Sequence, residues 1–156
     1  MEFCESVRAN TAKKYFTEGY NCAQAVALAF EDILPLDKEG ILLMSSPFGG
    51  GMGRMREVCG AVSGMFMVLG AKNGYSAPDD MEGKKRLYAE VRALADEFKA
   101  EFGSIICREL LEGVQTTTGG DPEKRSEAYY HKRPCGEQVA YCAYLLEKHL
   151  NNKGDI

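Results

Sequence analysis

Apolar residues recur at intervals of three and four along most of the sequence, which is the spacing of one face of an α-helix. The clearest stripe comprises Cys22, Ala25, Val26, Ala29, Phe30 and Ile33. A longer segment, 80–102, carries Leu87, Val91, Leu94, Phe98 and Phe102 on one face. No segment shows a convincing alternation of apolar and polar residues, the pattern typical of a β-strand. The sequence therefore predicts an all-α fold, a helical bundle of about six or seven helices.

Capping residues and helix breakers set the expected helix boundaries. Asn21 and Gln24 form a variant of the capping box at the start of one helix, which Pro35 ends at Leu34. The other expected helices span 3–17, 37–44, 56–69, 80–102, a short stretch from Ser104 to Gly113, and the segment from Pro134 onward. The glycine-rich residues 49–53 and residues 116–121 are expected to form loops, and Pro122 to start a charged turn or short helix.

Composition narrows the class of protein. The 156 residues are 45% hydrophobic and 27% charged, as in one globular domain, and we expect a single domain over residues 1–156. The formal net charge of −4 argues against nucleic acid or an anionic membrane as a partner. The longest uncharged stretch, 58–71, is too short to cross a bilayer, and we expect it to form a buried helix.

Cysteine usage points to a reducing compartment. Six cysteines are too few for a secreted disulfide scaffold, and no two of them stand at C-x-x-C spacing. That spacing is required for c-type haem attachment and for the common zinc-finger patterns, so neither is expected. The N-terminus lacks the basic and apolar regions of a signal peptide. We therefore expect a cytoplasmic protein.

Four cysteines fall at predicted helix starts: Cys22, Cys59, Cys107 and Cys135. A helix start exposes unpaired N–H groups and the positive end of the helix dipole, so we expect lowered thiol pKa values and thiolates able to ligate a metal. Cys4 lies beside the N-terminus. Cys142 lies two turns beyond Cys135 on the same helix, where a core position is expected. The four helix-start cysteines predict one convergent site.

A structural interpretation of each cysteine stays open. Free cysteine is among the most buried residue types and often acts as a small apolar side chain. The intervals between the four cysteines match no compact zinc or ferredoxin motif. The two histidines, His131 and His149, are more typical of surface positions than of ligands. No serine or carboxylate partner marks a hydrolytic triad.

The glycine-rich segment 49–56 has two interpretations. Its glycines, together with Arg54 and Arg56, could cradle a phosphate or border a cofactor, and the cofactor-binding candidates are Gly50, Gly51, Gly53 and Gly60. A structural turn is the alternative, because the segment lacks the Lys-Ser/Thr of a P-loop and follows no strand. Gly60 and Gly64, one turn apart, also suit close helix packing.

Several segments together resemble a known family. They are Tyr-Asn-Cys-Ala-Gln-Ala-Val at 20–26, Gly-Met-Gly at 51–53, Val-Cys-Gly-Ala-Val-Ser-Gly at 58–64, Cys-Arg-Glu-Leu at 107–110, and Cys135 with Val139. Over about residues 5–145 the chain resembles the redox-active proteins labelled by the pattern C_GCAxxG_C_C. The label has Gly-Cys-Ala, whereas Cys59 here stands between Val58 and Gly60.

The resemblance implies a cofactor and an assembly. The family is similar to the iron–sulfur part of split-Soret cytochromes c, which implies a helical, cysteine-ligated cluster site and a homodimer. The haem does not carry over, because the sequence has no C-x-x-C-H. The hypothesis is that Cys22, Cys59, Cys107 and Cys135 ligate an iron–sulfur cluster, most simply [2Fe–2S], for electron transfer to an unidentified redox partner protein.

Three alternatives to the cluster remain at this point. The cysteines could perform metal-free thiol–disulfide chemistry, which would make the protein an oxidoreductase. They could hold a structural zinc ion, or belong to the core of a binding module.

Methionines around the glycine-rich segment could cover a dimer or partner face, or belong to the core; they are Met44, Met52, Met55, Met65 and Met67.

Overall fold

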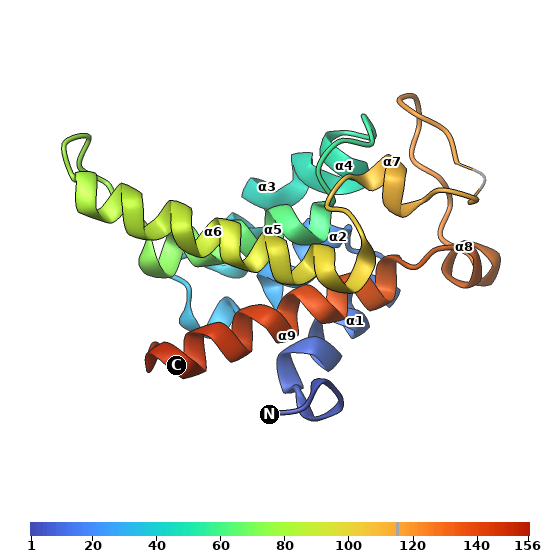
Figure 1. Cartoon of the computed structure of the whole chain (residues 1–156). Coiled ribbons are helices and arrows are strands. Elements are labelled where there is room, and N and C mark those ends of the chain that lie inside the picture. Colours follow the sequence, from blue (N-terminus) through green and yellow to red (C-terminus); the bar gives the residue numbers. More distant parts are fainter. Residues whose placement is uncertain (115) are drawn as a thin grey trace.

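Helices make up the regular structure of the computed structural model, which describes residues 1–114 and 116–156 (Figure 1). The longer helices are α1 (Val7–Thr17), α2 (Cys22–Leu28), α3 (Lys38–Ser45), α5 (Gly60–Asn73), α6 (Met81–Phe102) and α9 (Cys135–Lys153). Short ones are α4 (Gly49–Met52), α7 (Cys107–Leu110), α8 (Glu127–Lys132) and the 3-10 turns η1 (Phe3–Glu5), η2 (Glu31–Ile33) and η3 (Ser46–Phe48). The predicted all-α fold is confirmed.

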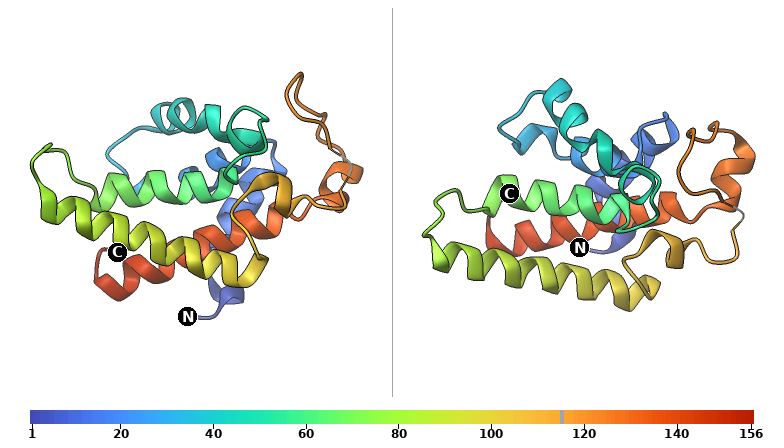
Figure 2. Two further views of the ribbon diagram at one scale, coloured as in Figure 1. Left: turned by 45° about the horizontal axis from the view of Figure 1, so that its top comes forward. Right: turned by 90° about the horizontal axis from the view of Figure 1, so that it is seen from above.

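The core lies between α2, α5 and α9. Helix α2 packs against α1, α3, α5 and α9, while α6 lies along α5 and α9. Helices α6 and α9 are in contact, and Figure 2 shows that they cross at an angle. Fully buried side chains from these helices include Val26, Val62, Met65, Phe98, Leu145 and Leu146. The expected buried helix at 58–71 corresponds to α5, most of whose residues are buried.

Several helix boundaries differ from those expected. Helix α1 begins at Val7 rather than residue 3, α7 begins at Cys107, and the short helix α4 lies within the expected loop 49–53. Helix α2 ends at Leu28 rather than Leu34, and η2 follows it. The Arg8 side chain accounts for this end, because its Nη1 donates to the carbonyl of Ala29 at 2.9 Å and its guanidinium lies 4.8 Å from the Phe30 ring centroid. Helix α5 begins at Gly60 rather than near residue 56, because the preceding residues have left-handed or extended backbone.

Helix starts meet at one end of the bundle. Figure 1 shows α4, α7 and α8 together at the end where α9 begins. An isolated antiparallel bridge between Val58 and Ile106 joins the entry of α5 to the entry of α7. Within it the N–H of Cys59 donates to Ile105 and the N–H of Cys107 donates to Glu57. Two predicted site residues that are distant in sequence are therefore neighbours.

The methionines divide between core and surface. Met65 is fully buried in α5, so the expectation that it helps to cover a partner face is wrong for this residue. Met44 and Met55 are each 57% exposed. In the part of the chain that the structure describes, no helix combines the length and apolarity needed to span a bilayer.

Candidate functional site

Four cysteine side chains line one small cavity of about 40 Å³ at the end where the helix starts meet. They are Cys22, Cys59, Cys107 and Cys135. Cys22, Cys107 and Cys135 are the first residues of α2, α7 and α9, whereas Cys59 is the N-cap of α5 rather than part of its first turn. The fold thus brings together the cysteines that the sequence grouped.

Local sequence positions Cys22 at its helix start. The Asn21 side chain accepts from the N–H of Gln24 at 2.9 Å, and Gln24 accepts from the N–H of Asn21 at 3.1 Å, so the predicted capping box is present. Gly60 then allows α5 to approach closely, because a Cβ at this position would lie 3.1 Å from the Cβ of Cys22 and 2.8 Å from the carbonyl oxygen of Phe48. A larger residue at position 60 would separate Cys22 from Cys59.

The glycine-rich segment positions Cys107. Every residue from Gly50 to Arg56 except Met55 has a positive φ, including the non-glycine residues Met52, Arg54 and Arg56. A Cβ on Gly51 would lie 2.6 Å from the Cβ of Cys107. The N–H groups of Arg56 and Glu57 donate to Gly50 and Gly51, which closes the loop on itself. The N–H groups of Gly53, Arg54 and Met55 are also bonded within this part of the chain, so they are not free to bind a phosphate.

The candidate glycines divide between two cavities. Gly50, Gly51 and Gly60 line the cysteine cavity. Gly53 lines a neighbouring outer cavity instead, together with Gly50. Gly64 approaches the backbone of Ala23 and serves the packing of α5 on α2, as the sequence suggested.

The other two cysteines and His149 do not line the cysteine cavity. Cys4 is exposed in η1, and Cys142 is fully buried in the core, as expected for both. His149 lies near the end of α9, where its Nε2 is 3.1 Å from a carboxylate oxygen of Glu90. The side chain of His131 lies outside the described part of the chain.

The expected lowering of the thiol pKa values holds for one cysteine and is wrong for three. A hydrogen bond from Cys22 outweighs burial and, with Arg133, Arg125 and Arg56 nearby, lowers the pKa of Cys135 to about 7. The same hydrogen bond has the opposite effect on Cys22: together with burial, it raises the pKa of Cys22 well above its usual value.

For the other two thiols, burial decides the sign. It raises the pKa of Cys59 to about 12 despite the nearby backbone N–H groups of Val62 and Ala61. It also raises the pKa of Cys107, although the Arg56 guanidinium acts in the opposite direction. Desolvation of a thiolate therefore outweighs the helix-start effect at both positions.

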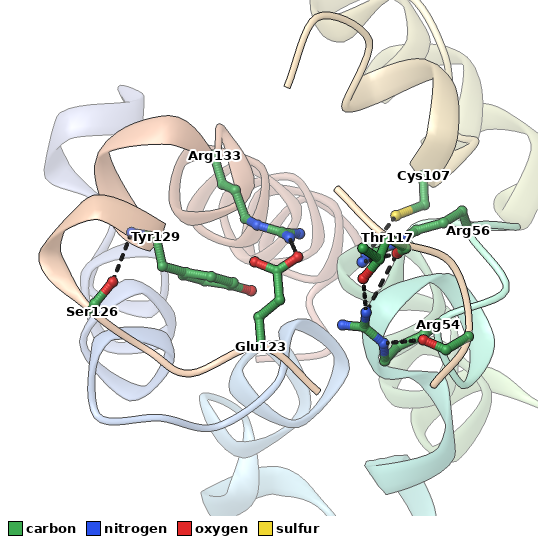
Figure 3. A network of polar contacts seen from close by, with 9 residues as sticks. Arg54, Arg56, Cys107, Thr117, Glu123, Ser126, Tyr129 and Arg133 are labelled. Carbon is green, nitrogen blue, oxygen red and sulfur yellow. Dashed lines mark hydrogen bonds and ion pairs between the residues drawn. The ribbon is translucent and has the colours of Figure 1, made fainter. Parts of the chain in front are cut away.

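Three arginines line the cavity: Arg56, Arg125 and Arg133. Of these, the sequence motifs had pointed only to Arg56, which belongs to the glycine-rich segment. The guanidinium of Arg56, whose residue is 4% exposed, has its Nη1 3.9 Å from the sulfur of Cys107 (Figure 3). Arg125 and Arg133 line the same cavity, as does Tyr129. Arg133 stands two residues before Cys135, which is the only signal that could have found it; Arg125 and Tyr129 carry none.

The thiols surround the cavity without meeting at one point. Within residues 1–114 and 116–156, no three or more Cys, His, Asp or Glu side chains are arranged so that they could hold a single metal ion. Cys22 and Cys135 line the same cavity and each shifts the pKa of the other, and the Val58–Ile106 bridge places Cys107 near Cys59. The arrangement suits a group larger than one ion, or chemistry of the thiols themselves.

Comparison with known proteins agrees with the cysteine arrangement. No curated protein and no solved structure matches the chain. A protein family described as "Putative redox-active protein (C_GCAxxG_C_C)" matches residues 20–149, a range that includes all four cysteines of the cavity. Because this match covers most of the sequence, the chain belongs to the C_GCAxxG_C_C family of redox-active proteins.

Proposed function

We propose that the protein is an electron carrier in which Cys22, Cys59, Cys107 and Cys135 ligate an iron–sulfur cluster, most simply [2Fe–2S]. The observation that carries this proposal is that these four thiols, from four different helix starts, line one cavity. Four cysteine thiolates are the usual ligand set of such clusters. Among the residues that the structure describes, the cavity lining includes no aspartate, glutamate or histidine, so the four thiols are the donors that suit such a cluster.

The charge around the cavity supports a bound anion. Thiolate ligation accumulates negative charge, and burying that charge without compensation is costly. Arg56, Arg125 and Arg133 all line the cavity and supply three positive charges. When bound, the cluster would supply one-electron redox chemistry, and the arginines would stabilise its negatively charged ligand shell.

The thiols would release protons as they ligate iron. Cys135, with a pKa of about 7, is partly ionised near neutral pH and can bind first. The raised pKa values of Cys22, Cys59 and Cys107 mean that their protons leave only when the metal replaces them. Incorporation of iron is therefore expected to be faster at mildly alkaline pH.

A second candidate function is thiol–disulfide exchange, favoured by the adjacency of Cys22 and Cys135. The Cys135 thiolate would attack a partner disulfide, forming a mixed disulfide and releasing one partner thiolate. Cys22, after losing its proton, would then displace the second partner sulfur. The partner would leave as a dithiol, and the protein would hold a Cys22–Cys135 disulfide.

Anaerobic purification with absorption spectroscopy and analysis of iron, sulfide and zinc tests the proposal. We expect visible absorption and stoichiometric iron and sulfide after reconstitution. Cys22→Ser, Cys59→Ser, Cys107→Ser and Cys135→Ser should each lose most of the iron. Cys142→Ala is the matched control, because Cys142 is a buried cysteine outside the cavity, and it should keep the iron.

Other outcomes would identify the alternatives. A colourless protein with stoichiometric zinc would support a structural zinc site instead. A colourless, metal-free protein that forms a Cys22–Cys135 disulfide on mild oxidation would support thiol–disulfide exchange. Loss of iron from Cys142→Ala but not from Cys135→Ser would show that the proposed ligand set is wrong.

A further inference from the structure

A larger outer cavity of about 350 Å³ adjoins the cysteine cavity. The two share several lining residues, among them Arg56, Arg125 and Arg133, so the same arginines border both cavities. Its volume falls at the lower end of the range for small-molecule sites. A small molecule in the outer cavity would therefore lie next to the cysteine site.

The outer cavity carries a marked excess of positive charge. Its lining includes four arginines, Arg54, Arg56, Arg125 and Arg133, and a single carboxylate, Glu123. Figure 3 shows Arg54 and Arg56 on one side and Arg133 with Glu123 on the other. The whole chain has a net charge of −4, so this concentration of arginine is local.

Most of this charge has no acidic partner. Arg133 pairs with Glu123 at 2.5 Å. In the described part of the chain, Arg54, Arg56 and Arg125 form no ion pair, and the oxygens they bind are carbonyl groups and the Thr117 hydroxyl. Guanidinium groups that are partly buried and have no carboxylate partner of their own strongly favour a bound anion.

Some of the donors are still available. Nη1 of Arg54, and Nε and Nη1 of Arg133, donate no hydrogen bond to any residue that the structure describes. Arg54 is partly exposed, whereas the side chain of Arg133 is 4% exposed and its guanidinium lies 4.5 Å from the Tyr129 ring centroid. Guanidinium N–H groups match the geometry of carboxylate and phosphate oxygens.

We propose that the outer cavity binds a small dianion with carboxylate or phosphate-type oxygens, between Arg54 and Arg133. Glu123 acts as an internal competitor, because it occupies one donor of Arg133 and supplies the only negative charge of the lining. The proposed binding does not depend on the proposed function, because arginines rather than cysteines line the outer cavity.

Calorimetric titration at low ionic strength with two probes, inorganic phosphate and succinate, tests the proposal. We expect saturable binding of at least one probe with one site per chain. Arg54→Gln should weaken binding about tenfold or more, since it removes a charged donor. Glu123→Gln should tighten binding, because it removes the competing carboxylate. Arg92→Gln, which removes an exposed arginine on α6, is the charge-matched control.

The pattern of outcomes separates this proposal from the function. Binding of phosphate alone would identify an oxyanion site, and binding of succinate alone a dicarboxylate site. Absence of saturable binding, or equal weakening by Arg54→Gln and Arg92→Gln, would overturn the proposal. The titration uses both anaerobically reconstituted protein and protein stripped of metal. A reconstituted protein that stays colourless and iron-free but still binds the dianion would refute the cluster and leave the anion site standing.

Discussion

Cys135 differs from the other cavity cysteines in the direction of its pKa shift, although Cys22 and Cys107 are also the first residues of their helices. It accepts the hydrogen bond that Cys22 donates, and three arginines face it. Cys59 has backbone N–H groups nearby, but burial dominates. At the scale of single residues, hydrogen bonding and opposite charge lower a thiol pKa, and desolvation raises it.

Replacing Arg133 with glutamine should raise the pKa of Cys135 above about 7, because it removes a positive charge that stabilises the thiolate. We expect alkylation of Cys135 by iodoacetamide at pH 7 to slow about fivefold, and its midpoint to move to higher pH. The measurement uses reduced, metal-free protein in a Cys4→Ser background, since Cys4 is exposed. An unchanged rate would show that Arg133 does not act on Cys135.

At the scale of single elements, the segment from Gly50 to Arg56 has a strained backbone next to the cysteine cavity. Left-handed backbone costs about 1–2 kcal/mol at each non-glycine residue, and Met52, Arg54 and Arg56 all adopt it. Arg54 and Arg56 bind Gly119 and Thr117, so a distant loop holds the segment in place. Such strain is typical of sites where the fold must present particular side chains.

Gly51→Ala should destabilise the protein strongly and disturb Cys107. Gly51 has a φ of 70°, and a new Cβ would lie 2.6 Å from the Cβ of Cys107 and 2.9 Å from the Cα of Arg56. We expect a loss of about 3 kcal/mol or more in the free energy of unfolding, measured with urea.

The matched control for Gly51→Ala is Gly53→Ala. Gly53 has a similar φ of 58° but open space around a new Cβ, so only the backbone cost of about 1–2 kcal/mol is expected. Equal losses in the two variants would mean that contact with Cys107 contributes nothing.

At the scale of the whole molecule, a polar cluster joins three helices at the end opposite the cysteines. Glu90 of α6, 8% exposed, accepts hydrogen bonds from Lys153 and Asn73 and contacts His149. Burial raises the pKa of Glu90, but the hydrogen bonds from these partners outweigh it, and the net pKa is lowered. The cluster ties the ends of α5 and α9 to the middle of α6.

Glu90→Gln should lower the free energy of unfolding by about 1–3 kcal/mol near neutral pH. Because the folded-state pKa of Glu90 lies below its usual value of 4.5, the contribution of the carboxylate is complete above that value. It is lost as the pH falls through the folded-state pKa. Urea unfolding of both proteins from pH 7 to pH 3 should show the difference shrinking at low pH; a constant difference would contradict this.

We also expect the protein to self-associate through the exposed apolar side chains of α3. Leu43 and Met44 are 65% and 57% exposed. Light scattering should give twice the chain mass of 17.2 kDa. Leu43→Glu should shift the protein toward the monomer, whereas Val7→Glu, at a 71% exposed position on α1, should not. A monomer at all concentrations would show that the dimer prediction is wrong.

The sequence by itself determined the all-α class and most helix starts, because capping residues and apolar spacing act within a few residues of each other. The capping box of α2, the start of α6 after Asp80 and the start of α9 after Pro134 follow from such local patterns. The same local patterns also predicted that cysteines lie at or next to helix starts. The prediction that Cys142 is a core residue follows from its position two turns beyond Cys135 on the same helix.

Only the tertiary structure decided how buried and how charged each thiol is. Arg125 lines the cavity together with Cys22 and Cys135, an arrangement that no local sequence pattern encodes. The early end of α2 depends on Arg8, a residue of another helix. Desolvation and charge pairing arise from contacts between residues distant in sequence, so the direction of each thiol pKa shift became visible only in the folded molecule.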